Sequence, residues 1–191
     1  MFLVFDTETT GLPKRWDAPI SDHENWPRCV QIAWQLHDDF GNCVEHKDFI
    51  VSPEGFDIPF ESEQIHGIST ALSTKEGSAI NAILADFNTA LAKSKYIIGH
   101  NVKFDVNIIG AELDRLGLDT SVTTTPILDT CTEHTATLCQ IPGGRGGRFK
   151  LPTLSELYKQ LFDDSFDQAH NATSDVEATA RAFFELLRRN K

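Results

Sequence analysis

Residues 2–8 read FLVFDTE, an apolar run that ends in two carboxylates. A short apolar run of this kind predicts a buried strand. Strand side chains repeat every two residues, so Asp6 and Glu8 share one face of that strand. Neighbouring acids raise each other's pKa unless a cation lies between them, and hard cations such as Mg²⁺ or Mn²⁺ prefer oxygen ligands. The stretch therefore predicts a divalent metal site, with a solvated strand end before a turn as the alternative.

The sequence beyond this run alternates between strand and helix patterns. Further strands are expected over residues 30–37, 44–51, 96–100 and 127–130, with a turn at 39–42. Apolar residues at helical spacing predict helices over residues 78–92, 102–116, 153–162 and 173–189. A hairpin followed by strand–helix alternation indicates an α/β protein whose mixed sheet is flanked by helices. Residues 13–28 and 142–149 are expected to be loops, because proline or glycine interrupts both.

Length and composition indicate a globular protein with a single domain over residues 1–191. Hydrophobic residues make up 40% of the chain, and the formal net charge is −11. No apolar run approaches the roughly 18 residues that a membrane helix needs, so no membrane segment is expected. Four scattered cysteines favour reduced thiols and a cytoplasmic location. The acidic balance argues against a protein that coats long stretches of nucleic acid through charge alone, but not against one that binds a nucleic-acid end through metal ions.

Two further stretches carry acids where helices are expected to begin. In HNVKFDVNII, residues 100–109, Asp105 lies in the first turn of a predicted helix. In AHNATSDVEATARAFFELL, residues 169–187, Asp175 begins the last helix and His170 precedes it by five residues. Each acid alone would be read as a partner of the helix dipole, and His170 alone as a surface residue. Together with the first stretch they supply four acids and one histidine, which is the set that two-metal cleavage of a phosphodiester requires.

The three stretches resemble the motifs of one enzyme family. FDTETTGLP (residues 5–13), HNVKFDVNII and HNATSDVEAT (residues 170–179) are similar to the Exo I, Exo II and Exo III motifs of the DEDDh (DnaQ-like) 3′–5′ exonucleases. They occur in the family's order, and the resemblance covers essentially the whole chain. Within the family it is closest to the proofreading exonuclease of bacterial DNA polymerase III, as an epsilon subunit or an exonuclease domain.

The resemblance implies an RNase H-like fold with a mixed five-stranded sheet, and it implies roles for the acids. Asp6 would bridge two ions of Mg²⁺ or Mn²⁺, Glu8 and Asp175 would complete the site of the first ion, and Asp105 would act on the second. His170 would be the general base, since the pKa of histidine lies near working pH. The products would be nucleoside 5′-monophosphates released from a 3′ end.

The resemblance also implies residues that bind the substrate. The backbone around Thr9 and Gly11 would cradle the terminal nucleotide, and Leu12 would wedge against the last bases. His66, in the stretch IHGIS, would line the pocket for the terminal base, and Asn101 would lie near the strand. The alternatives are a simple turn with one core leucine, a structural histidine, and an asparagine that caps the helix expected from residue 102.

Basic and aromatic residues in the two expected loops are further candidates. The stretch GGRGGRFK, residues 143–150, holds Arg145 and Arg148 without an acid, so these side chains could bind phosphates. A solvated loop is the alternative. Trp16 and Trp26 lie in the long segment after the first motif and could either stack on bases or pin the segment to the core.

The expected partner is the single-stranded 3′ end of DNA, with a DNA polymerase subunit or domain as a possible second partner. RNA is the alternative substrate, as in family members of the RNase T or oligoribonuclease type. A catalytically silent module that binds a polymerase is a third hypothesis. A silent relative would be expected to have lost a metal carboxylate, and Asp6, Glu8, Asp105 and Asp175 are all present.

Overall fold

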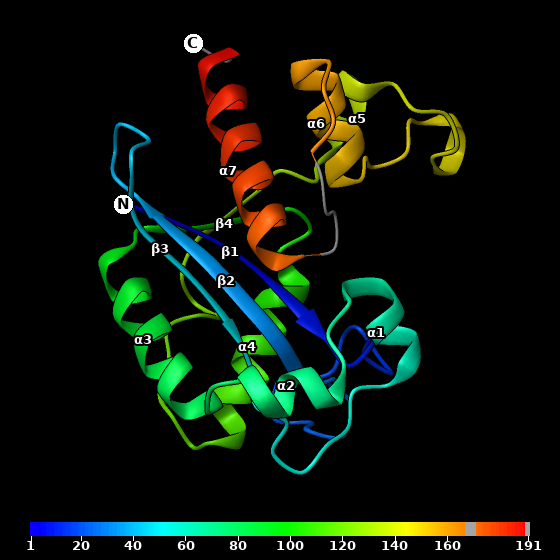
Figure 1. The fold of residues 1–191 in the computed structure, drawn as a ribbon. Helices are drawn as coiled ribbons and strands as arrows, with labels where there is room; N and C mark the ends of the chain where they lie inside the picture. Colours follow the sequence, from blue (N-terminus) through cyan, green and yellow to red (C-terminus); the bar gives the residue numbers. More distant parts are fainter. Residues whose placement is uncertain (167–170, 190–191) are drawn as a thin grey trace.

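The strand that carries the first motif lies at the centre of the sheet (Figure 1). The computed structural model describes residues 1–166 and 171–189. The five strands follow the order β3-β2-β1-β4-β5. β1 pairs antiparallel with β2 and parallel with β4, so the sheet is mixed, as predicted. The strands are β1 (Phe2–Thr9), β2 (Cys29–His37), β3 (Cys43–Ile50), β4 (Tyr96–Gly99) and β5 (Ile127–Asp129). Each strand begins and ends within one residue of its predicted bounds.

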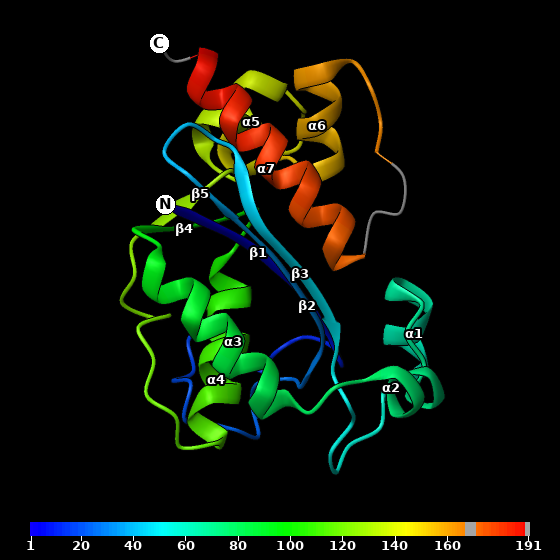
Figure 2. The ribbon, with the colours of Figure 1, turned by 60° about the vertical axis from the view of Figure 1, so that its left-hand side comes forward.

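Four helices expected from the apolar spacing are present. They are α3 (Ile80–Lys93), α4 (Lys103–Arg115), α6 (Leu154–Phe162) and α7 (Ala172–Arg189). α3 and α4 cover one face of the sheet and α7 covers the other (Figure 2). Thr153 caps α6, because its hydroxyl accepts a hydrogen bond from the backbone nitrogen of Glu156. None of the helices in the described part of the chain combines the length and apolarity needed to span a bilayer.

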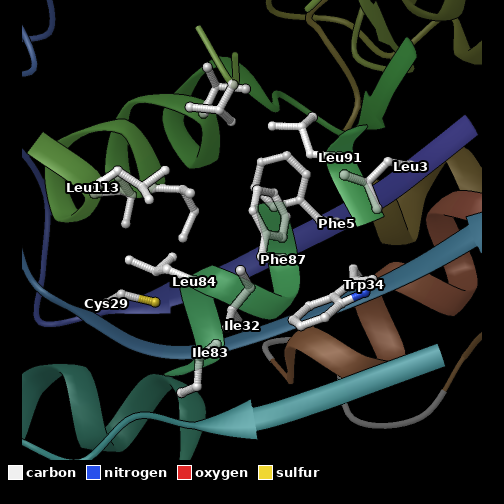
Figure 3. Close-up of a cluster of buried hydrophobic side chains, with 14 of the residues drawn as sticks. Leu3, Phe5, Cys29, Ile32, Trp34, Ile83, Leu84, Phe87, Leu91 and Leu113 are labelled. Atoms are coloured by element: carbon white, nitrogen blue, oxygen red, sulfur yellow. The ribbon is translucent and has the colours of Figure 1, made fainter. Parts of the chain in front are cut away.

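Alternation along β1 divides its side chains between two cores. Leu3 and Phe5 point toward α3 and α4, where Phe5 meets Phe87 edge to face with ring centroids 5.1 Å apart (Figure 3). Val4 points the other way and packs with Val176 of α7. Asp6 and Glu8 continue the face of Val4, so they are directed toward α7. Burial of both faces thus decides where the two acids lie.

Three short helices were not predicted. They are α1 (Phe60–His66), α2 (Thr70–Glu76) and α5 (Glu133–Cys139). Each has seven residues, too few for an apolar period to be recognised. The predicted loop over 142–149 contains a single 3₁₀ turn, η1 (Arg145–Gly147).

The long segment after β1 is held on α4 by a buried carboxylate. Glu112 is 1% exposed, and its Oε1 accepts hydrogen bonds from Arg28 Nε and Cys29 N, both at 2.9 Å. Arg115 Nη1 lies 3.2 Å from the same oxygen. Arg115 also donates to the backbone oxygen of Trp26 at 2.7 Å. Trp26 is 3% exposed, so the interpretation that it pins the segment to the core is confirmed.

We predict that Glu112→Ala lowers the free energy of unfolding by about 3 kcal/mol or more, because it leaves Arg28 and Arg115 partly buried without their carboxylate. Urea unfolding of the wild type and the variant measures the change. The matched control is Glu133→Ala, which removes a carboxylate 3.3 Å from Arg148 at the surface, where the two side chains are 74% and 72% exposed, and which should change stability by less than about 1 kcal/mol. Equal effects of the two substitutions would contradict the structural role of Glu112.

Candidate active site

Three acids from the two ends of the chain meet where β1 ends. Asp6 and Glu8 come from β1, and Asp175 comes from the first turn of α7. One carboxylate oxygen from each lies within 4.8 Å of the others. The packing of Val4 against Val176 sets this meeting, because it presses the start of α7 onto the face that the acids share.

Asp105 reaches the same region from α4. Its Oδ1 accepts hydrogen bonds from Thr7 N at 3.0 Å and from Thr7 Oγ1 at 2.6 Å. β4 pairs with β1 only from Phe2 to Val4, so the backbone of β1 beyond that point has no parallel neighbour and its amide is free to bind a side chain. Asp105 is 5% exposed and occupies this position. The four predicted acids therefore come together.

The acids repel one another strongly. Burial raises the pKa of Asp6 well above its usual range, and repulsion by Asp105, Asp175 and Glu8 adds to the effect. Burial and repulsion by Asp175 and Asp105 raise the pKa of Glu8 to about 8. Burial also raises the pKa of Asp105 to about 7, against the opposing hydrogen bonds from Thr7. Clustered oxygen donors with no salt bridge to Asp6 or Glu8 in the described part of the chain fit hard divalent cations.

The acids open into a cleft of about 600 Å³. Its other walls come from the end of β4, the start of α4 and the chain before α6; the lining residues beyond the acids include His100, Asn101, Phe104, Cys131 and Leu151–Leu154. His100 joins two of these walls, since its Nδ1 lies 2.9 Å from Thr130 Oγ1 and its Nε2 lies 2.9 Å from the backbone oxygen of Pro152.

Asp129 shapes one wall of this cleft and was missed by the sequence reasoning. Its carboxylate accepts hydrogen bonds from the backbone nitrogens of Asn101 at 2.8 Å, Val102 at 3.1 Å and Cys131 at 2.7 Å. Asn101 has a φ of 62°, so the turn before α4 is left-handed at a non-glycine residue. The reading of Asn101 as a side-chain cap of α4 is wrong, because α4 has no side-chain cap. An acid at the end of an apolar strand, as at Asp6, was the available signal.

The predicted nucleotide-binding residues gather in an adjoining cleft of about 230 Å³. Thr9, Gly11, Leu12 and His66 line it, and Phe104 is shared with the acid cleft. Leu12 is 74% exposed, which contradicts its alternative reading as a core residue. Burial lowers the pKa of His66, so its ring is neutral near pH 7.

Two of the candidates lie elsewhere, and one is outside the described residues. Arg145 and Arg148 do not line either cleft, and Arg148 Nη1 is 3.3 Å from Glu133 Oε1 on α5. The structure therefore does not bring these arginines together with the acids. His170 lies outside the described residues.

Comparisons with known proteins agree with this geometry. The exonuclease family model RNase_T matches residues 3–183. The DNA polymerase III subunit epsilon of Rickettsia prowazekii is 30% identical over 184 residues, covering 96% of this chain and 72% of the relative. The 3′–5′ exonuclease DinG of Bacillus subtilis is 31% identical over 189 residues, covering 97% of this chain but only 17% of the relative.

The fold has solved counterparts. E. coli exonuclease I in complex with a dT13 oligonucleotide matches with a TM-score of 0.76 and 23% identity, over 98% of this chain. This chain spans 40% of that structure's chain. The likeness confirms the RNase H-like fold that was expected from the sequence.

We predict that the stability of the metal-free protein falls as pH rises from about 5 to about 8. The folded protein retains a proton on Glu8 up to a pKa of about 8, whereas the unfolded chain loses it near the usual value, so rising pH favours unfolding. Each such proton changes the free energy of unfolding by about 1.4 kcal/mol per pH unit. Urea unfolding in EDTA at several pH values measures the slope.

Glu8→Gln should flatten that slope, while the exposed control Glu76→Gln should leave it unchanged. A wild-type protein whose stability in EDTA rises over this pH range would refute the electrostatic account of the cluster.

Proposed function

Since the chain belongs to the exonuclease family RNase_T, we propose that it is a metal-dependent 3′–5′ exonuclease that proofreads DNA during replication. It would release nucleoside 5′-monophosphates from a 3′ end. The observation that supports this most directly is the meeting of Asp6, Glu8 and Asp175 within 4.8 Å at one end of an open cleft. Mutual repulsion raises the pKa of Asp6 and of Glu8, so bringing these acids together costs stability that a bound cation would offset.

Different residues of the site would bind the metal ions, orient a ligand and accept a proton. Asp6, Glu8 and Asp175 would hold one divalent cation, and Asp6 and Asp105 a second, with Mg²⁺ or Mn²⁺ as the expected ion. Bound there, the cations would lower the pKa of a water molecule and offset charge on the scissile phosphate. Thr7 would keep the Asp105 carboxylate in one orientation through its two hydrogen bonds. His170 would take the proton from the attacking water.

The adjoining cleft would hold the terminal nucleotide. Leu12 presents an exposed apolar surface there, and the mostly buried ring of His66 lines the same cleft. Phe104 borders both clefts, so a nucleotide in the smaller cleft would place its phosphate toward the acids. This arrangement supports binding of a single unpaired end.

The net charge agrees with capture of an end. Two divalent cations would change the net charge from −11 to −7, which still disfavours binding to long duplex DNA through charge alone. The similarity to an epsilon subunit, over 72% of its length, supports a DNA polymerase as the partner that supplies the main grip on DNA. We also propose that residues 1–191 act as one exonuclease domain.

We predict that the protein shortens a single-stranded DNA oligomer from its 3′ end in Mg²⁺ or Mn²⁺, and that EDTA stops the reaction. Asp6→Ala should lower the rate by about a thousandfold or more, because it removes a ligand shared by both cations. Chromatography of the released 5′-mononucleotides measures the rate, and parallel DNA and RNA oligomers compare the two substrates. Asp119→Ala removes an exposed acid outside both clefts and serves as the control. Full activity of Asp6→Ala would refute the proposal.

We predict that His170→Ala lowers the rate by about a hundredfold to ten-thousandfold, since general-base catalysis contributes that much. Titration with Mn²⁺ should show that metal binding is retained. The rise in rate with pH should be lost in the variant, because the titrating base is gone. His134→Ala, an exposed histidine on α5, is the matched control. A large loss of Mn²⁺ affinity in His170→Ala would instead indicate a metal ligand.

A further inference from the structure

The three tryptophans differ in exposure: Trp16 and Trp26 lie in the segment between β1 and β2, and Trp34 lies in β2. Trp26 is 3% exposed and donates from Nε1 to the backbone oxygen of Pro19 at 3.0 Å, and Trp34 is fully buried. Trp16 is 58% exposed. A tryptophan ring exposed to this extent stabilises the fold little, so Trp16 is available for another role.

Trp16 lies beside the wall that the two clefts share. Its ring centroid is 5.8 Å from that of Phe104, with the ring planes tilted by 53°. Phe104 borders both the acid cleft and the smaller cleft. The two rings therefore continue the surface of the clefts outward along the protein.

A buried asparagine holds this aromatic surface in place. Asn25 is 5% exposed, and its side chain binds both backbone groups of Arg15: Oδ1 accepts from Arg15 N at 2.7 Å, and Nδ2 donates to Arg15 O at 3.0 Å. Lys14 N also donates to Asn25 O at 3.2 Å. The backbone next to Trp16 is thus fixed before any ligand binds, which lowers the entropy lost on binding.

Three exposed cations lie next to the two rings in the sequence, although the chain as a whole is acidic. Lys14 and Arg15 precede Trp16 and Lys103 precedes Phe104, while the exposed Asp17 follows Trp16. The nearest acid to Arg15 is Asp22, with a separation of 4.0 Å between Nη2 and Oδ2. Exposed cations beside aromatic rings are typical of surfaces that bind single-stranded nucleic acid.

We propose that Trp16 stacks on an unpaired base of the strand, upstream of the nucleotide that is released, while Lys14 or Arg15 approaches its phosphate. The inference rests on the proposed function and extends it to strand selection. A base can stack on Trp16 only when it is free of a complementary strand, so this surface favours single-stranded ends. The alternative is that Trp16 only covers the ring of Phe104.

Steady-state kinetics on DNA oligomers of increasing length test this subsite. Trp16→Ala should raise KM for a single-stranded 12-mer by about tenfold, with a much smaller change in kcat, because a base stacked on an aromatic ring contributes binding. The rise in KM should be smaller for a dinucleotide, which does not extend to Trp16. Trp16→Phe should retain most of the affinity. Phe40→Ala removes a 91% exposed aromatic ring from the β2–β3 turn and serves as the control.

Tryptophan fluorescence gives a readout that does not depend on turnover. Trp16 is the exposed one of the three tryptophans, so oligo-dT should quench emission in the wild type and not in Trp16→Phe. Equal KM values for Trp16→Ala and wild type on the 12-mer, with no quenching, would overturn the inference and leave the exonuclease proposal intact. An inactive wild-type protein would refute the exonuclease proposal, and quenching would then still report whether Trp16 binds single strands.

Discussion

The repulsion among four carboxylates at the end of β1 is the constraint on which the rest of the structure depends. Asp6, Glu8, Asp105 and Asp175 come from three distant parts of the chain, and no favourable contact among them draws them together. Packing elsewhere must supply that free energy. On one face of the sheet Val4 packs with Val176 of α7, which delivers Asp175, and on the other Phe5 shares a core with Val106 of α4, which delivers Asp105.

The buried acid Glu112 differs from the clustered acids in having cationic partners. Glu112 lies 1% exposed between Arg28 and Arg115, and its charge is matched within the fold. Asp6 and Glu8 form no salt bridge in the described part of the chain, although burial raises the pKa of both. Glu112 thus has cationic partners within the fold, whereas Asp6 and Glu8 offer carboxylate oxygens that fit a divalent cation. That contrast, rather than the count of acids, distinguishes the site from a structural ion pair.

Backbone hydrogen bonds to carboxylates position the walls of the site. Asp105 accepts from Thr7, and Asp129 accepts from Asn101, Val102 and Cys131. The turn before α4 brings the side chain of Val102 close to the backbone of Gly99. A Cβ at position 99 would lie 2.4 Å from that side chain, so the turn needs glycine there. The Asp129 contacts hold the left-handed turn at Asn101 and so help to set where α4 begins. The local strain is offset by contacts that reach across the ends of β4 and β5.

By itself, the sequence determined the five strands and the four longer helices, because strand and helix periods are local signals, and it singled out the four acids that the fold brings together. It did not reveal α1, α2 and α5, whose seven residues are too few to show a period. Only the tertiary structure decided that Asp129 shapes the cleft, that Trp26 is buried while Trp16 is exposed, and that Arg145 and Arg148 lie outside both clefts. These outcomes depend on contacts between residues far apart along the chain, such as Glu112 with Arg28, and no local pattern records such contacts.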